Sequence, residues 1–327
     1  MSAVQADPVR AVVAAGGDPA ARLMERLEDR LAALATGHGE QLGRFAGDTI
    51  AAGGKRLRPL LLFLAAGVPP PETDEVLWAA VSVELVHSAT LVHDDVLDGS
   101  PLRRGRPTVV AAGGRLPATA TGDLLFSRAF AELVRSGSVE SVRVLSRASS
   151  ELASGELMQR ADAFTAVALE RYLERCRLKT AVLFRAACEL GALGGGAAGE
   201  RVAALGGFGE RIGLAFQLLD DILDVSGPPE RTGKPQGADL LDGTVNLPFI
   251  LARERDRGLA AIDPRSITSS RRAAEVCAHI IATGALDAAR ARALDMVASA
   301  KASLPGVPAA QRSALELVAD AVIERYS

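Results

Sequence analysis

Two copies of a DDxxD carboxylate motif restrict what this chain can fold into more than any other feature. The aspartates are Asp94, Asp95 and Asp98 in the first copy, and Asp220, Asp221 and Asp224 in the second. Each copy follows about ten mostly apolar residues, which predicts that it lies at the C-terminal end of an apolar helix. Aspartates four residues apart share one helix face, where their like charges repel unless a cation lies between them.

A single copy on a helix is most often an ordinary solvated surface, but two copies that both follow apolar runs make that interpretation weak. Three arginines, Arg103, Arg104 and Arg106, come soon after the first copy. Carboxylates bind hard cations and arginine binds oxyanions, so the combination predicts a Mg²⁺–phosphate site. Two such helices facing each other would form a pocket with an acidic rim and an apolar interior.

The composition favours an all-α protein. Hydrophobic residues make up 48% of the chain and aromatic residues only 4%, with alanine and leucine dominant, a mixture that favours helices over sheets. The motifs are expected on helices from about Asp74 to Leu97 and from about Glu200 to Val225, and no segment predicts a convincing strand. We expect residues 1–20 to be a flexible lead-in and residues 21–327 to form a single all-α domain.

Charge and cysteine content exclude several classes of protein. The formal net charge is 37 − 40 = −3, which argues against general nucleic-acid binding. The three cysteines have no metal-ligand spacing and suit a reducing cytosol. No signal peptide is evident, and no apolar run approaches the roughly 18–20 residues that span a bilayer. We therefore expect a soluble, cytoplasmic protein without a transmembrane segment.

Seven motifs then occur in an order that resembles one family. They are GGKRLRP at 53–59, HDDVLD at 93–98, LRRGRPT at 102–108, GD at 122–123, KT at 179–180, QLLDDILD at 217–224 and GKPQGADL at 233–240. From about residue 20 to 325 the chain resembles the trans-isoprenyl diphosphate synthases, or polyprenyl synthetases. The resemblance implies an all-α fold around a deep cavity, and a Mg²⁺-dependent prenyltransferase that joins isopentenyl diphosphate head to tail to an allylic diphosphate. It also implies about three Mg²⁺ ions per site, a homodimer, and a product that membrane enzymes can receive.

The resemblance also assigns roles to individual residues. Magnesium would be held by Asp94, Asp98 and Asp220, with support from Asp95, Asp221 and Asp224. The allylic diphosphate would be bound by Arg103, Lys179 and Lys234, and isopentenyl diphosphate by Lys55, Arg58, His87 and Arg104. The catalytic set would be Lys179, Thr180 and Gln217, together with Asp94, Asp95, Asp98 and Arg103.

The chain departs from the family pattern after residue 239, where it reads DLLDGTVNLP. Thr244 stands in place of a lysine and Asn246 in place of a threonine, so one possible diphosphate cation is lost. Class I terpene cyclases share the fold and the first motif, but their second metal motif often opens with asparagine, and Asn246 is the only asparagine here. A cyclase-like enzyme, or the catalytic subunit of a heteromeric synthase, remains the alternative. A metal hydrolase of the HD type is disfavoured, because His87 and His93 lie within two turns of one helix.

Residues just before the first motif bear on product length. In the family, the growing chain descends along this helix, whose pitch of about 5.4 Å per turn is comparable to one isoprene unit. Ala89 and Thr90 lie one turn below Asp94 and are small, which leaves this shaft open. Phe126 and Phe130 are candidates for a deeper floor. We expect a linear product of C20 or longer, with C30 or more favoured.

Overall fold

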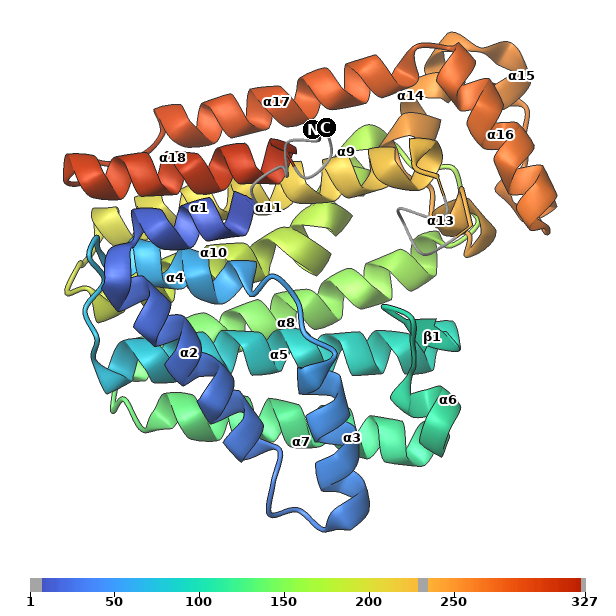
Figure 1. The fold of residues 1–327 in the computed structure, drawn as a ribbon. Helices are drawn as coiled ribbons and strands as arrows, with labels where there is room; N and C mark the ends of the chain where they lie inside the picture. The colour runs from blue at the N-terminus through green and yellow to red at the C-terminus, as the bar shows by residue number, and fades with distance from the viewer. Residues whose placement is uncertain (1–7, 229–234, 325–327) are drawn as a thin grey trace, which may run out of the picture. The chain divides into compact units, whose positions relative to one another are not determined.

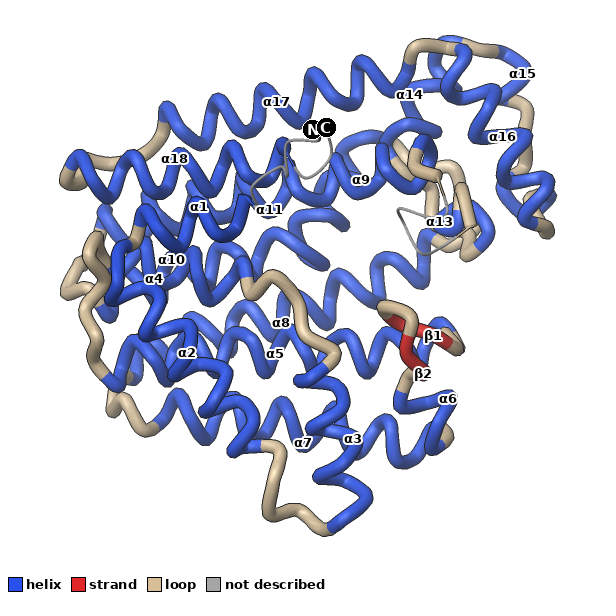
Figure 2. The backbone as a smooth tube through the Cα atoms, in the orientation of Figure 1, coloured by secondary structure: helices blue, strands red, loops and turns tan. Residues whose placement is uncertain are grey.

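The computed structural model describes residues 8–228 and 235–324, and their regular structure is almost entirely helical (Figure 1). The predicted all-α class is confirmed. One correction concerns strands, of which none was expected. Leu102–Arg103 (β1) and Arg106–Pro107 (β2) form a two-stranded antiparallel hairpin directly after the first DDxxD motif (Figure 2).

The described chain divides into two compact units. The first contains residues up to 149, 183–209 and 303–321, and the second contains 150–182, 210–302 and the residues from 322 onward. The chain passes from one unit to the other within α8, at the start of α10, within α11, at the end of α17 and within α18. The assignment of residues 21–327 to a single domain stays a prediction.

Seven helices lie entirely in the first unit. They are α1 (Pro8–Ala15), α2 (Gly17–Leu34), α3 (Glu40–Ala51), α4 (Leu57–Ala66), α5 (Asp74–Asp98), α6 (Val109–Gly113) and α7 (Arg115–Val134). The helices that the two units share are α8 (Val139–Asp162), α10 (Val182–Gly194), α11 (Glu200–Ser226) and α18 (Ala309–Glu324).

The second unit adds several shorter helices and one long one. These are α9 (Leu169–Cys176), the π-helical turn η1 (Arg177–Ala181), α13 (Ala238–Leu241), α14 (Leu247–Arg255), α15 (Arg257–Ala260), the 3₁₀ turn η2 (Pro264–Ser266), α16 (Ser270–Ala282) and α17 (Ala285–Ala302).

Residues 8–20 were predicted to belong to a flexible lead-in, and this is wrong. They form α1 and the beginning of α2, with Gly17 at a φ of 72° providing the turn between them. Val12, Ala20 and Leu23 are fully buried. Helical structure in this region therefore begins earlier than the two glycines suggested, because glycine at positive φ can join two helices without unwinding either.

Helix α5 is the central element of the first unit and matches the predicted helix within one residue. Thr73 caps its first turn by accepting a hydrogen bond from the Val76 amide (3.4 Å), and Gly99 ends it with a left-handed φ of 62°. Most of its side chains are buried, and α5 packs against α7. The first DDxxD motif thus occupies the last turn of a buried helix, as its sequence predicted.

The contact between α5 and α7 depends on Gly122, the glycine of the GD motif. A Cβ atom at position 122 would lie 2.2 Å from His93 Nε2, far closer than atoms approach. The His93 ring also stacks on Phe126, with ring centroids 5.8 Å apart, so it has little freedom to move away. Glycine is required here because the imidazole occupies the space of a side chain.

We expect Gly122→Ala to lower the free energy of unfolding by about 1–3 kcal/mol, the usual cost of overpacking a well-packed contact. Chemical denaturation would measure it. Gly47→Ala on α3 is the matched control, because its Cβ would lie 3.8 Å from Ala35, an ordinary contact. A helical glycine with room for a methyl group gains stability from alanine. Equal stability losses in both variants would contradict the argument.

The structure corrects the expectation that no apolar segment is long enough to span a bilayer. Within the described residues, α5 and α11 are each long and apolar enough to cross a bilayer by length and composition. In the most apolar 18-residue stretch of each helix, 72% of α5 and 50% of α11 is buried inside the protein. Burial accounts for the apolar character of α5, and neither helix is a clear membrane span.

The C-terminal helix closes the first unit by a buried polar contact. The Gln311 side-chain amide, on α18, donates hydrogen bonds to the carbonyl oxygens of Leu64 (2.9 Å) and Ala65 (3.0 Å) at the end of α4. The carbonyls of a last helical turn lack the usual intrahelical partners, and the Leu64 carbonyl also accepts a hydrogen bond from the Gly67 amide at 3.3 Å. Gln311 therefore satisfies the end of α4 from 247 residues away in sequence.

Candidate active site

The aspartates of the first motif occupy different environments. Asp95 is buried, accepts a hydrogen bond from Nε of Arg103 on β1 at 2.9 Å, and forms an ion pair with Nη2 of the same arginine at 2.7 Å. Asp94 is half-buried and Asp98 is exposed at the end of α5. Asp95 therefore joins the hairpin to the helix, and the supporting metal role predicted for it stays a prediction. Asp94 and Asp98 are the members left nearer to solvent.

The carboxylates at the end of each motif helix, taken separately, are of the type that fits a magnesium ion. Carboxylate oxygens are the ligands that Mg²⁺ prefers, and the negative end of a helix dipole favours a cation there. No group of three or more His, Cys, Asp or Glu side chains in residues 8–228 and 235–324 is placed to hold a metal. Proteins commonly bind Mg²⁺ through one or two carboxylates, with waters and substrate phosphates as the other ligands.

The residues predicted for isopentenyl diphosphate gather in the first unit. His87 is partly buried, and burial together with the positive charge of Arg58 and Arg104 lowers its pKa well below 6.5. The imidazole is therefore neutral at pH 7, so it can donate a hydrogen bond without adding charge. The Arg104 guanidinium lies against Gly54, where an added Cβ would come within 3.1 Å of Nη1. Lys55, the residue after Gly54, is exposed.

A cavity of about 490 Å³ lies beside this cluster, between α3, α5, α6 and the hairpin. Its lining includes four residues that the sequence singled out, Asp95, Arg103, Arg104 and Arg106. Arg44 and Asp48 on α3 also line it. Sequence reasoning missed both, because exposed charges on an amphipathic helix carry no motif that separates them from ordinary surface residues.

The second motif has one strongly constrained aspartate. Asp221 is buried and accepts hydrogen bonds from the Tyr172 hydroxyl (2.6 Å), the Gln217 amide (2.9 Å) and the backbone amide of Leu247 (3.2 Å). Burial raises its pKa above the ordinary value, while these donors act in the opposite direction. Asp220 is exposed and Asp224 half-buried. Asp221 thus connects α9, α11 and α14, and its supporting role toward the metal stays a prediction.

We expect Tyr172→Phe to destabilise the protein by about 1–3 kcal/mol, because it removes one donor from a buried carboxylate. The shape of the side chain is otherwise kept, so the loss reports the hydrogen bond rather than packing. Thermal unfolding followed by circular dichroism would measure it. Unchanged stability would mean that the Tyr172–Asp221 contact is not formed in solution.

Lys179 and Thr180 lie in the π-helical turn η1, a feature often found at functional sites. The Thr180 hydroxyl donates to Gln217 Oε1 at 2.7 Å, so the structure brings together two residues that were predicted to act on the reacting carbons. Lys179 Nζ pairs with Glu156 Oε2 at 2.6 Å. Gly155 allows this approach, since a Cβ there would lie 2.7 Å from the Lys179 amide nitrogen.

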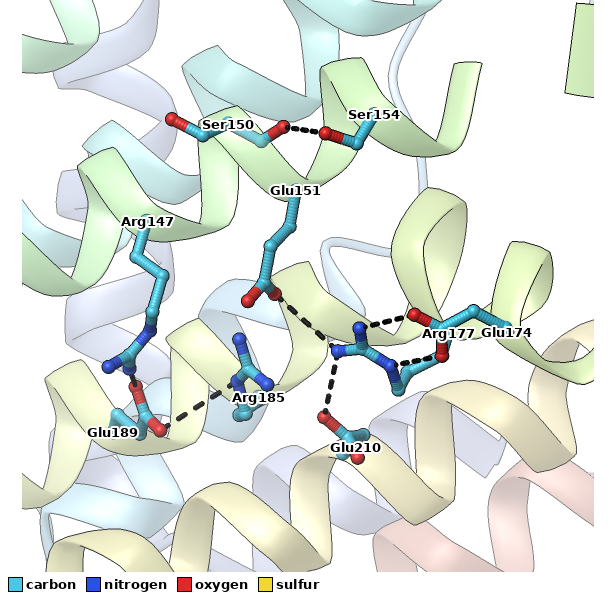
Figure 3. A network of polar contacts seen from close by, with 9 residues as sticks. All are labelled: Arg147, Ser150, Glu151, Ser154, Glu174, Arg177, Arg185, Glu189 and Glu210. Atoms are coloured by element: carbon cyan, nitrogen blue, oxygen red, sulfur yellow. Dashed lines mark hydrogen bonds and ion pairs between the residues drawn. The ribbon is translucent and has the colours of Figure 1, made fainter. Parts of the chain in front are cut away.

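Arg177, the first residue of η1, fixes the turn through a set of glutamates (Figure 3). It donates two 2.8 Å hydrogen bonds to Glu174, and ion pairs connect it to Glu151 (3.7 Å) on α8 and Glu210 (3.9 Å) on α11. The Glu174 hydrogen bond is the main reason that the pKa of Arg177 is raised. The permanently charged Arg177 therefore ties the segment that carries Lys179 to two helices.

The departure from the family pattern has a structural counterpart. Asn246 is the N-cap of α14, and its side-chain oxygen accepts a hydrogen bond from the Phe249 amide at 3.2 Å. Asparagine and threonine both cap helices well, so this replacement keeps the local structure. Thr244 is half-buried and donates its backbone amide to the Asp239 carbonyl (2.7 Å). Lys234, predicted to bind the allylic diphosphate, lies outside the described residues.

The proposed shaft residues lie where α5 is buried. Ala89 is fully buried, and the half-buried Thr90 donates its hydroxyl to the His87 carbonyl at 2.8 Å. Phe126 does not match its suggested place in a deeper floor. Its ring stacks on His93, next to Asp94, and therefore lies at the level of the motif.

Comparison with known proteins connects this geometry to one family. The sequence model of the polyprenyl synthetase family matches residues 40–281. Heptaprenyl diphosphate synthase component 2 of Geobacillus stearothermophilus is 43% identical over 222 residues, covering 68% of this chain and 69% of that protein. Geranylfarnesyl diphosphate synthase of Natronomonas pharaonis is 37% identical over 308 residues, covering 84% of this chain and 87% of that protein.

Solved structures agree with the sequence relatives. The polyprenyl synthase from Caulobacter crescentus CB15, complexed with calcium and isoprenyl diphosphate, has a TM-score of 0.89 and 36% identity, and the match covers 98% of both chains. The decaprenyl diphosphate synthase from Rhodobacter capsulatus has a TM-score of 0.86 and 33% identity. On the match over residues 40–281 and these similarities, the chain belongs to the polyprenyl synthetase family, as its seven motifs predicted.

Proposed function

We propose that this chain is a trans-polyprenyl diphosphate synthase that joins isopentenyl diphosphate head to tail to an allylic diphosphate. The observation that carries the proposal is the gathering of Arg58, His87 and Arg104 in the unit that also contains the first DDxxD motif. Cations beside a cation-binding carboxylate motif suit a substrate pair that carries two diphosphates. Membership in the polyprenyl synthetase family supports the same activity.

In the proposed reaction, the allylic carbon–oxygen bond breaks and its electron pair leaves with the diphosphate. Magnesium, when bound by Asp94, Asp98 and Asp220, supplies charge stabilisation for that leaving group. Arg103, Lys179 and Lys234 neutralise further charge on it, and fixed cations of this kind stabilise a developing anion strongly. Lys179 is held by Glu156 in the substrate-free protein, so diphosphate binding would exchange one anionic partner for another.

The second substrate, isopentenyl diphosphate, forms the new carbon–carbon bond with the allylic cation. Lys55, Arg58, Arg104 and the neutral His87 would hold isopentenyl diphosphate while its double bond attacks the allylic cation. The cation that results from this attack then loses a proton, and we propose that the departing diphosphate is the base that accepts it. Thr180 and Gln217, hydrogen-bonded to each other at 2.7 Å, would face the reacting carbons. Exclusion of water from this region prevents it from quenching the cation.

Product length, oligomeric state and location are part of the proposal. We favour a product of C30 or more, with C20 as the lower limit, because Ala89 and Thr90 leave the shaft open. We propose that the protein is a cytoplasmic homodimer. Three apolar side chains support an interface because they are exposed: Leu116 (80%) and Val134 (60%) on α7, and Val139 (71%) at the start of α8. A relative named as component 2 of a synthase makes a second type of subunit the competing arrangement.

The experiment incubates the purified chain with Mg²⁺, labelled isopentenyl diphosphate and C5, C10, C15 or C20 allylic primers. Linear Mg²⁺-dependent products, sized after dephosphorylation, are expected. Light scattering on the same sample measures the oligomeric state. A cyclic hydrocarbon formed from a primer alone would establish the cyclase alternative. No turnover by the chain alone, but turnover after addition of a partner subunit, would establish the heteromeric one.

A further inference from the structure

A buried arginine lies inside the segment proposed to bind isopentenyl diphosphate. Arg56 is 7% exposed, although it sits between the exposed Lys55 and the half-buried Leu57. Its backbone adopts a left-handed conformation with a φ of 46°, which is uncommon for a residue with a side chain. A strained, buried arginine between two proposed substrate ligands needs a physical reason.

The side chain provides that reason, because it is bonded to three separate elements. Its Nε and Nη2 donate to the two carboxylate oxygens of Glu28 on α2, at 2.7 and 3.1 Å. Its Nη1 donates to Glu84 on α5 at 2.7 Å, and Nη2 also donates to the Ile50 carbonyl of α3 at 2.9 Å. These contacts tie the turn before α4 to α2, α3 and α5 at once.

The electrostatics keep the arginine charged and the arrangement stable. Burial acts to lower the pKa of Arg56, but the hydrogen bonds to Glu28 and Glu84 raise it above its ordinary value. Glu84 is itself buried, which raises the pKa of its carboxyl, and the Arg56 charge counteracts that effect. Geometry and charge therefore hold Arg56 in one position, and with it the left-handed backbone that places its neighbours.

The N-terminus of α4 has no side-chain cap. Arg56 is the N-cap residue, and its side chain makes no capping hydrogen bond, since a guanidinium has no acceptor for the helix amides. Free amides and the positive end of a helix dipole favour an anion at such a position. Arg58 lies in the first turn of α4, and Lys55 directly precedes the cap. The turn thus presents two cations beside a helix N-terminus.

We infer that Arg56 is a positioning residue for isopentenyl diphosphate: anchored by Glu28 and Glu84, it fixes the left-handed turn that presents Lys55, Arg58 and the N-terminus of α4. The inference rests on the proposed function and adds to it a residue that does not touch substrate. Misplacement of binding groups by about 1 Å can cost about 10²-fold in rate. The predicted defect is therefore in the use of isopentenyl diphosphate, with the allylic substrate unaffected.

The test compares Arg56→Lys and Glu28→Gln with the unchanged protein. Lysine keeps the charge but cannot bond to both glutamates, and Glu28 is exposed, so its replacement leaves no new buried charge. We expect the KM for isopentenyl diphosphate to rise about 10- to 10²-fold in Arg56→Lys, with a smaller rise in Glu28→Gln. The KM for the allylic diphosphate should change less than about twofold. Calorimetric binding of isopentenyl diphosphate without an allylic partner gives a second readout.

Arg30→Lys is the matched control. Arg30 also makes a two-pronged ion pair, with Glu132 at 2.9 and 2.5 Å in the same unit, but it is not part of the turn. If Arg56→Lys lost stability like Arg30→Lys, yet bound isopentenyl diphosphate as tightly as the unchanged protein, the positioning role would be overturned. If the unchanged protein bound no isopentenyl diphosphate and formed no product, the proposed function itself would fail.

Discussion

Replacing Asp94 with alanine is expected to lower kcat by about 10²- to 10³-fold, the size of effect seen when one electrostatic stabiliser of a developing anion is lost. Asp94 lies at the negative end of α5, where a cation offsets both the motif charge and the helix dipole. Without this carboxylate, magnesium would bind more weakly and the leaving diphosphate would lose part of its stabilisation. Steady-state rates measured across a Mg²⁺ titration would show both effects.

The fold should survive this change, because Asp94 is half-buried and Asp95 carries the contact to Arg103 that joins α5 to the hairpin. Asp94→Asn keeps the shape and is expected to need more Mg²⁺ for half-maximal rate. Asp29→Ala, an exposed aspartate on α2, is the control and should leave kcat and the Mg²⁺ requirement unchanged. Full activity of Asp94→Ala at the ordinary Mg²⁺ concentration would remove the first motif from the proposed metal site.

Ala89→Phe is expected to shorten the product by several isoprene units. Ala89 is fully buried on α5 about one turn below Asp94, and each turn rises about 5.4 Å, close to the length of one isoprene unit. A benzyl group there would block the shaft near its top, so elongation would stop after one or two additions. Chromatography of the dephosphorylated products, with mass spectrometry, would show the shift.

Folding must be checked in the same experiment, since filling a buried alanine site costs about 1–3 kcal/mol when the surroundings are well packed. A variant with a normal melting temperature and an unchanged product would contradict the shaft model. Thr90→Ala is the control, because it removes bulk at the adjacent position and is expected not to shorten the product. Loss of all products by a stably folded Ala89→Phe would place Ala89 at the reacting carbons instead.

The elements of the fold that could be predicted from sequence depend on local signals. The two motif helices were predicted to begin and end within one residue of α5 and α11, because apolar runs, a Thr73 cap and glycine after the motif are all encoded nearby. The hairpin of β1 and β2 was missed, since two-residue strands carry no alternating pattern. Residues 8–20 were misjudged because glycine and proline can occur at helix starts as well as in loops.

The contacts that hold the candidate site depend on tertiary structure, and sequence patterns could not show them. Tyr172 meets Asp221 across 49 residues, and Lys179 meets Glu156 across 23. Nothing in the local sequence distinguishes Tyr172 or Glu156 from other polar residues of amphipathic helices. The KT, GKR and DDxxD motifs gave the residues with proposed chemical roles, whereas the side chains that contact them became visible only in three dimensions.

The hydrogen bonds from Gln311 to the end of α4 have a consequence for folding during synthesis on the ribosome. The unit that contains α4 also includes residues 303–321, and Gln311 satisfies carbonyls that were synthesised nearly 250 residues earlier. Multidomain proteins commonly fold their N-terminal part first during translation. Here the first unit cannot be completed early, because it includes residues of α18, the last helix in the described part of the chain. The surface of the first unit that α18 covers should therefore stay exposed on nascent chains until α18 has been synthesised.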